Sequence, residues 1–162
     1  MYLPYLLGVR SPWWDLSARG AFIGLSGSTT PGDMARAVME GVGFNLKIIL
    51  DILQGTLPLR QLTVIGGGAE SPVWMQILAD IWQQSLRLVT SPREATSMGA
   101  AVCAGVAIGM YPDFSAVKLF DRERDTVFFR KQPVYPELAQ AFEAACRGLA
   151  QTNELLAAIR RR

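Results

Sequence analysis

The stretch from Leu62 to Trp74 constrains the fold of this chain more than any other. Residues 62–65 form a short apolar run without polar alternation, which is typical of a buried strand. Three glycines follow at once at positions 66–68. Ser71 then suits the N-cap of a helix, and Pro72 suits its first position, where the missing N–H costs nothing. The sequence therefore predicts a strand, a glycine turn and a helix in that order.

A glycine turn of this kind has a chemical use. Glycine has no Cβ, so its main chain can approach a ligand closely. The unbonded N–H groups at the start of the following helix suit phosphate or other acceptor groups. The alternative is a tight turn that binds nothing, which would be the simpler interpretation of a single glycine. Three consecutive glycines favour a ligand, because each one costs backbone entropy and a plain turn needs fewer.

Two familiar nucleotide-binding patterns do not fit this stretch. A dinucleotide fingerprint needs G-x-G-x-x-G and an acidic residue about twenty positions later. Gly66 and Gly68 fill its first two glycine positions, but Ser71 stands at the third, and the next expected strand ends without an acid. A phosphate-binding P-loop needs a lysine directly after its glycines. No lysine follows Gly68 until Lys118.

Composition excludes several classes of function. A chain of 162 residues, half of them apolar, suits one compact domain with a core. The net charge of +2, without a dominant basic face, does not suggest a nucleic-acid partner. The sequence contains no histidine, so the commonest general base and the commonest metal ligand are missing.

Cysteine use and hydropathy favour a cytoplasmic protein without a membrane segment. Cys103 and Cys146 lie in helical patterns without a partner motif, as expected for reduced packing thiols. Residues 1–7 are apolar but lack the basic start and cleavage site of a signal peptide. The most apolar run, residues 98–110, is shorter than the ~20 residues that cross a bilayer, and Pro112 follows it.

Elsewhere in the chain, expected strands alternate with expected helices, which indicates an α/β layer. A strand or an extended lead-in is expected at residues 1–7, and strands are expected at residues 21–25, 62–65 and 86–89. The first long helix is expected to begin with Thr30 as N-cap and Asp33 as the capping-box acid. Gly41 and Gly43 lie inside this helix, so we expect close approach by another element there.

Three further expectations concern the second half of the chain. Residues 91–94 read as a full capping box with proline first, opening a helix to about Met110. Residues 121–125 alternate in charge and indicate a solvated loop. Pro136 is expected to start one last amphipathic helix.

Four segments of the chain together resemble the FGGY carbohydrate kinases. Residues 20–25 and 33–40 resemble the second signature of that family. Residues 4–15 resemble its PYLSGERTPYWD segment, residues 66–74 its GGGARSPLW adenosine motif, and residues 94–101 its EEAGALGAA helix. Four ordered motifs at compatible spacing are far more specific than any one alone.

The resemblance implies an RNase H-like fold, as in the actin-like ATPases, in which two α/β domains close on ATP and sugar. It implies that the second domain supplies most of the adenine and ribose site. Gly67 and Gly68 match the glycines whose main chain packs on the nucleotide, and Gly66, Ala69 and Ser71 belong to the same segment. The implied cofactor is ATP with Mg²⁺, and its metal ligands are not expected in this chain.

Two positions depart from the family pattern. Pro72 stands where some relatives have an asparagine that bonds the base, which puts one base contact in doubt but none of the main-chain contacts. Val9 replaces the usual glutamate before Arg10.

The resemblance is strongest over residues 1–118, and residues 119–162 contribute a loop and a final helix. We expect residues 1–162 to form a single domain, the later part of the second domain of a kinase. In this family the sugar-binding residues, the aspartate base and a phosphate loop precede the segment that matches Met1. The chain alone is therefore expected to have no sugar kinase activity.

Three functional hypotheses follow. The first is the ATP-binding part of a sugar kinase, most similar to the ketopentose kinases, whose partners would be ATP or ADP and a sugar held by the other domain. The second is a Rossmann-like dinucleotide binder, which the missing third glycine and ribose acid disfavour. The third is a non-catalytic interaction domain that forms a homo-oligomer through an exposed sheet edge and apolar surface.

Overall fold

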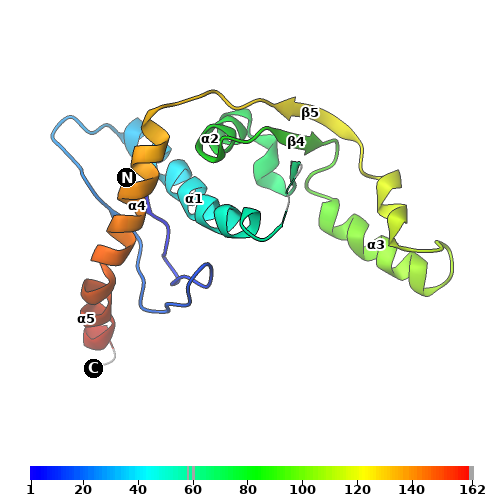
Figure 1. Cartoon of the computed structure of the whole chain (residues 1–162). Helices are drawn as coiled ribbons and strands as arrows, with labels where there is room; N and C mark the ends of the chain where they lie inside the picture. The colour runs from blue at the N-terminus through cyan, green and yellow to red at the C-terminus, as the bar shows by residue number, and fades with distance from the viewer. Residues whose placement is uncertain (58, 60, 161–162) are drawn as a thin grey trace. The chain divides into compact units, whose positions relative to one another are not determined.

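The computed structural model describes residues 1–57, 59 and 61–160. Their contacts group them into two compact units, each described by itself below (Figure 1). The first unit comprises Met1–Pro58, Asp80–Trp82 and Lys131–Arg162. The second comprises Leu59–Ala79 and Gln83–Arg130.

A three-stranded sheet organises the second unit. Strand β3 (Leu62–Val64) pairs in parallel with β4 (Leu86–Val89), and β5 (Glu123–Val127) pairs antiparallel with the other side of β4. Helix α2 (Pro72–Trp82) connects the two parallel strands, as a parallel pair requires. The predicted succession of strand, glycine turn, helix and strand is confirmed.

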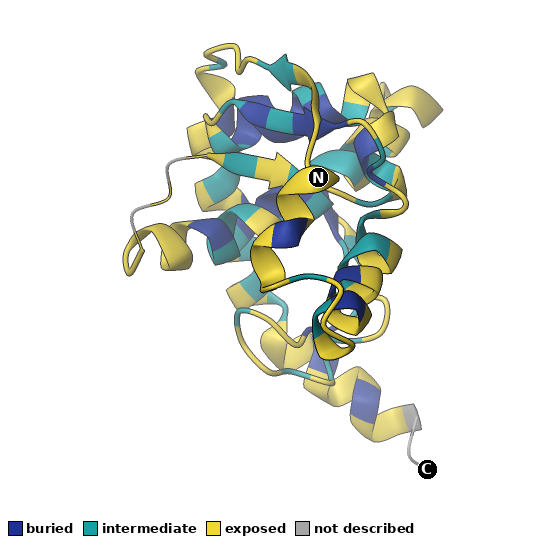
Figure 2. Ribbon diagram, turned by 90° about the vertical axis from the view of Figure 1, so that its right-hand side faces the viewer, coloured by how far each residue is buried: buried dark blue, intermediate teal, exposed yellow. Residues whose placement is uncertain are grey.

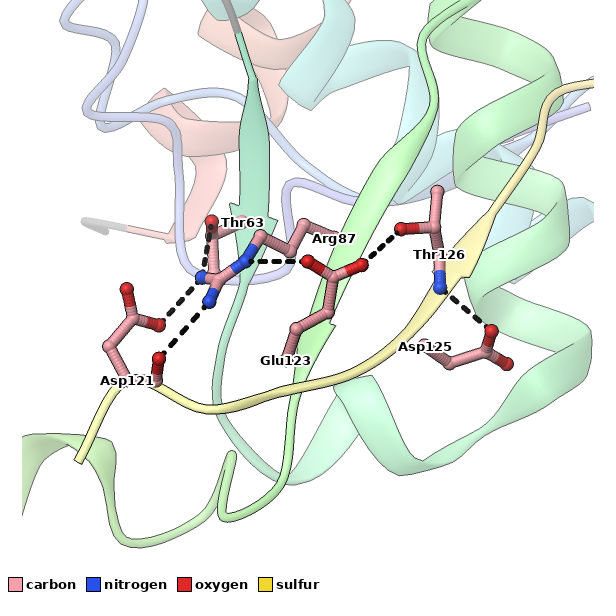
Figure 3. Close-up of polar contacts among 6 residues, drawn as sticks. All are labelled: Thr63, Arg87, Asp121, Glu123, Asp125 and Thr126. Carbon is pink, nitrogen blue, oxygen red and sulfur yellow. Dashed lines mark hydrogen bonds and ion pairs between the residues drawn. The ribbon is translucent and has the colours of Figure 1, made fainter. Parts of the chain in front are cut away.

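Strand β5 corrects part of the prediction of a solvated loop at residues 121–125: these residues are exposed as predicted, but residues 123–125 belong to a strand. Arg87 of β4, whose side chain is only 12% exposed, forms ion pairs with Asp121 at 2.6 Å and with Glu123 at 3.4 Å (Figure 3). The alternating charges therefore belong to an edge strand whose acids meet a cation across the sheet. Within a short sequence window, such a strand and a charged loop look alike.

The start of helix α3 (Ala95–Ala107) corrects a second prediction. No side chain caps this helix, and residues 92–94 form a turn instead of the predicted capping box. The carbonyl oxygen of Pro92 accepts a hydrogen bond from the N–H of Gly66, and Arg93 pairs with Glu70. Contacts with the glycine turn thus hold this segment outside the helix. A short 3₁₀ helix, η2 (Phe114–Leu119), follows α3.

The first unit begins with a two-stranded antiparallel sheet, β1 (Tyr2–Leu3) and β2 (Ala21–Phe22), followed by helix α1 (Pro31–Gln54). The predicted start of α1 is confirmed, because Thr30 and Asp33 form the reciprocal capping box. A Cβ on Gly41 would collide with the main-chain carbonyl of Tyr2. The predicted close approach at this glycine is therefore confirmed, and β1 is the element that approaches.

The C-terminal residues form two consecutive helices where one was predicted. Helix α4 (Val134–Gly148) ends at Leu149, and α5 (Ala150–Arg160) follows. Gly148, a weak helix former, stands at the break. Helix α5 has few buried positions among exposed ones, as Figure 2 shows. Among the described residues, no helix combines the length and hydropathy needed to cross a bilayer.

Aromatic side chains form the core of the first unit. The ring of Phe142 is fully buried and lies 5.6 Å from Phe44 and 6.5 Å from Tyr5, measured between ring centroids. The ring of Tyr135 lies 6.1 Å from that of Phe44. These contacts pack α4 against α1.

The side chains of Tyr135, Glu40 and Arg36, here called the polar triangle, interact across the same interface between α1 and α4. The hydroxyl of Tyr135 donates to Glu40 Oε1 at 3.0 Å and accepts from Arg36 Nη2 at 2.9 Å, while Arg36 Nε contacts Glu40 at 2.7 Å. Burial of the ring, followed by the charge of Glu40, raises the pKa of Tyr135. Tyr135 stays neutral and links the two charged side chains of α1 to α4.

The substitution Tyr135→Phe tests this triangle. It keeps the buried ring but removes the hydroxyl, so we expect the free energy of unfolding to fall by about 1 kcal/mol. Chemical denaturation of the purified chain measures this change. Tyr111→Phe is the matched control, because that hydroxyl has no hydrogen bond within the described residues; an equal loss in both variants would contradict the role of the triangle.

The capping box of α1 predicts a pH dependence. The main-chain N–H of Thr30, and then its hydroxyl, donate to Asp33 and lower the pKa of that carboxylate. Its contribution to stability is therefore complete above the ordinary aspartate pKa of about 3.9 and is lost as the pH falls through the lowered pKa. Melting curves of the wild type and of Asp33→Asn should differ by a constant amount near neutrality and converge in acid. A constant difference down to acid pH would contradict this coupling.

Candidate functional site

Residues 65–71, here called the glycine loop, connect β3 to α2. Gly66 has a φ of +91°, which favours glycine, and its N–H donates to Pro92 O at 2.7 Å. The 3₁₀ helix η1 (Gly67–Glu70) follows, and Ser71 caps α2 by accepting from the N–H of Trp74 at 3.3 Å. The predicted N-cap and first helical proline are confirmed, with η1 as an addition that the sequence did not indicate.

The three glycines of the loop have different surroundings. A Cβ on Gly66 or Gly67 would meet no atom within 4 Å, and Gly67 is exposed. A Cβ on Gly68 would collide with the ring of Trp74. Open main chain is therefore found at Gly66 and Gly67, whereas Gly68 allows the indole of α2 to pack closely.

Main-chain donors are available in the same place. Within the described residues, the N–H groups of Gly67 and Gly68 make no main-chain hydrogen bond, and Pro72 has no N–H. The next N–H along the loop, that of Ala69, is used internally and donates to Gly66 O at 3.0 Å. Two adjacent donors at the start of a helix are an arrangement that suits an anionic or acceptor-rich ligand.

Three contacts fix the loop from neighbouring segments. Besides the bond between Gly66 and Pro92, Arg93 Nε donates to Glu70 Oε2 at 2.6 Å, and Arg124 Nη2 donates to Ala69 O at 3.2 Å. The charge-assisted bond with Glu70 raises the pKa of the Arg93 guanidinium, which stays charged. One short segment, which these contacts hold in place, therefore contains the sequence-predicted site residues Gly66, Gly67, Gly68, Ala69 and Ser71.

The sequence did not indicate that Pro92, Arg93 or Arg124 contacts the glycine loop. The signal that could have found the first two is topological. Loops that follow neighbouring parallel strands emerge at the same edge of a sheet, so the segment after β4 must lie beside the segment after β3. Opposite charges in those two segments, Glu70 and Arg93, then suggest a pair.

A partly apolar hollow of about 200 Å³ adjoins the loop in the second unit. Ile65 and Ser91, which directly precede Gly66 and Pro92, belong to its lining, together with Met98, Phe120 and Asp121. Mostly apolar walls with a few polar groups are typical of small-molecule sites. A larger hollow of about 360 Å³ lies in the first unit, and none of the sequence-predicted site residues lines it.

No cluster of three or more histidine, cysteine, aspartate or glutamate residues that could hold a metal occurs in the described part of the chain. The indole Nε1 of Trp74 is buried without a hydrogen-bond partner. Its six-membered ring is the part that contacts Gly68.

A match to a known protein family shows the class to which this chain belongs. Residues 1–108 match the model described as "FGGY family of carbohydrate kinases, C-terminal domain". The chain belongs to the FGGY family of carbohydrate kinases. The resemblance found in the four sequence motifs is therefore confirmed, and so is the predicted fold class, the actin-like ATPase fold of these kinases.

Individual relatives agree with this assignment. The xylulose kinase of Staphylococcus epidermidis is 35% identical over 162 residues, covering 97% of this chain and 32% of that protein. The crystal structure of xylulose kinase from Rhodospirillum rubrum superposes with a TM-score of 0.75 at 30% identity, covering 95% of this chain and 31% of that one. The structure of Plasmodium falciparum glycerol kinase with ADP gives a TM-score of 0.66 at 25% identity, covering 99% and 30%. The chain thus spans about a third of the length of these relatives.

The distinct surroundings of the glycines predict distinct costs of substitution. Gly68→Ala should lower the free energy of unfolding by about 1–3 kcal/mol, because its methyl group would overlap Trp74. Gly67→Ala should change it by less than about 0.5 kcal/mol, because its methyl group would point into open space. Thermal or chemical unfolding of the two variants checks this, and equal losses would contradict the described packing.

Proposed function

We propose that this chain is the ATP-binding part of an ATP-dependent sugar kinase, most similar to the ketopentose kinases. The adenosine of the nucleotide would lie against Gly66, Gly67 and Gly68, with Ala69 and Ser71 beside it. The observation that carries this proposal is the open main chain at Gly66 and Gly67, next to the unbonded N–H groups of Gly67 and Gly68.

A flat nucleoside needs a surface without side chains, and the positions of Gly66 and Gly67 leave 4 Å of free space where a Cβ would stand. The free N–H groups of Gly67 and Gly68, at the start of the short 3₁₀ helix η1, favour the negative charge of the attached phosphates. The related glycerol kinase whose structure contains ADP supports a nucleotide as the ligand.

The substrate proposal rests on the relatives. Xylulose kinases stand among the most similar curated proteins and solved structures, which supports a ketopentose as phosphoryl acceptor. Phosphoryl transfer depends on positioning and on charge stabilisation by a metal and a base. In the whole enzyme, an aspartate would deprotonate the terminal hydroxyl of the sugar for attack on the γ-phosphate of Mg-ATP. The residues of this chain would hold the nucleoside and orient its phosphates.

Residues 1–162 would belong to one domain of a cytoplasmic enzyme. A different domain of that enzyme would hold the sugar. The ligands of Mg²⁺ would also lie outside this chain.

Calorimetric titration with ADP tests the nucleotide proposal. We expect the chain to bind ADP and Gly67→Ala to weaken binding about tenfold or more, because the added methyl group would occupy the space of the nucleoside; tenfold corresponds to about 1.4 kcal/mol. Gly27→Ala is the matched control, since it adds a methyl group at another open glycine. Equal affinities of Gly67→Ala and wild type would contradict the proposal, as would a preference for NADH over ADP.

A coupled assay tests the absence of kinase activity in the isolated chain. With ATP, Mg²⁺ and D-xylulose, the purified chain should release no more ADP than without the sugar, because the proposed base and sugar pocket lie elsewhere. Sugar-dependent ADP release would overturn this part of the proposal.

A further inference from the structure

The glycine loop carries one acidic residue, Glu70, two positions after the last glycine. Its carboxylate is 39% exposed and is paired with Arg93, which comes from the turn after β4. The Arg93 side chain is 65% exposed. An ion pair with this exposure adds little to folding stability. Its main effect therefore comes from the place of the two charges beside the glycine loop.

The glycine loop contains both groups that attract an anion and a group that repels one. The N–H groups of Gly67 and Gly68 favour an anion, but the carboxylate of Glu70 belongs to the same 3₁₀ helix and would repel one. No lysine or arginine occurs within residues 65–71 to offset that charge. Among the described residues, Arg124, which lies outside the loop, donates to the carbonyl oxygen of Ala69. Arg93, also outside the loop, donates to the carboxylate of Glu70.

We propose that Arg93 is a positioning residue that neutralises Glu70, so that the glycine loop accepts the phosphates of an anionic nucleotide. This inference rests on the proposed nucleotide site and adds a specific electrostatic role to it. Arg93 acts through Glu70, and no direct contact between its guanidinium and the phosphates is required.

The role predicts opposite effects for the two halves of the pair. Arg93→Ala leaves the carboxylate uncompensated and should weaken ADP binding about two- to fivefold, as expected for one charge acting through a largely aqueous path. Glu70→Gln removes the repulsion and leaves Arg93 charged, so ADP should bind as tightly as to the wild type or more tightly. The double variant should lie between the two single variants.

Two further measurements separate this role from a structural one. Adenosine carries no charge, so its affinity should be the same in the wild type and in all three variants. The loss of ADP affinity in Arg93→Ala should shrink in about 1 M salt, where the Debye length is near 3 Å. Arg147→Ala is the matched control, because it breaks an exposed ion pair with Glu143 on α4, in the other unit.

The outcomes are distinguishable. If Arg93→Ala and Glu70→Gln weaken ADP binding equally, or if adenosine affinity falls together with ADP affinity, the pair only shapes the loop and the inference is overturned. If the wild type binds ADP and the variants bind it equally well, the inference alone fails. If the wild type does not bind ADP, the nucleotide proposal fails and this inference fails with it.

Discussion

The hydrogen bond from the Gly66 N–H to the Pro92 carbonyl oxygen joins the two loops that follow the parallel strands β3 and β4. Parallel strands place their carboxyl ends at one edge of the sheet, so the two loops emerge side by side. The bond is short, at 2.7 Å, and it occupies the one glycine of the loop with a positive φ. It also explains why residues 92–94 stay outside α3, and it lies next to the ion pair between Glu70 and Arg93. The turn that precedes the open main chain of Gly67 is therefore held by a contact between loops.

Features set by neighbouring residues could be predicted from the sequence. The Thr30–Asp33 capping box, the Ser71 N-cap and the β4 strand each depend on signals within a few positions, and the structure confirms them. Strand β5 could not be predicted in this way, because its charged residues become a strand only by pairing with β4 and with Arg87. Residues 91–94 likewise have the local sequence pattern of a capping box, but contacts with the glycine loop hold them in a turn instead.

The candidate site shows the same division. The sequence located the glycine loop, and its family resemblance matched Gly67 and Gly68 together to the glycines that pack on the nucleotide. The structure separates them, since Gly68 faces the Trp74 ring and Gly67 faces open space. The residues that brace the loop, including Arg124, come from segments distant in sequence. Membership of the FGGY kinases fixes the class of the protein, and the chain spans about a third of the length of its relatives.

We propose above that the main chain at Gly66–Gly68 receives an adenine nucleotide. Two-dimensional ¹H–¹⁵N NMR of the labelled chain during addition of ADP tests it most directly, because the amides concerned report individually. The largest shifts are expected at the amides of Gly67 and Gly68, with little change in the aromatic core of the first unit around Phe142. Unchanged Gly67 and Gly68 amides at saturating ADP, or shifts centred on that core, would contradict it.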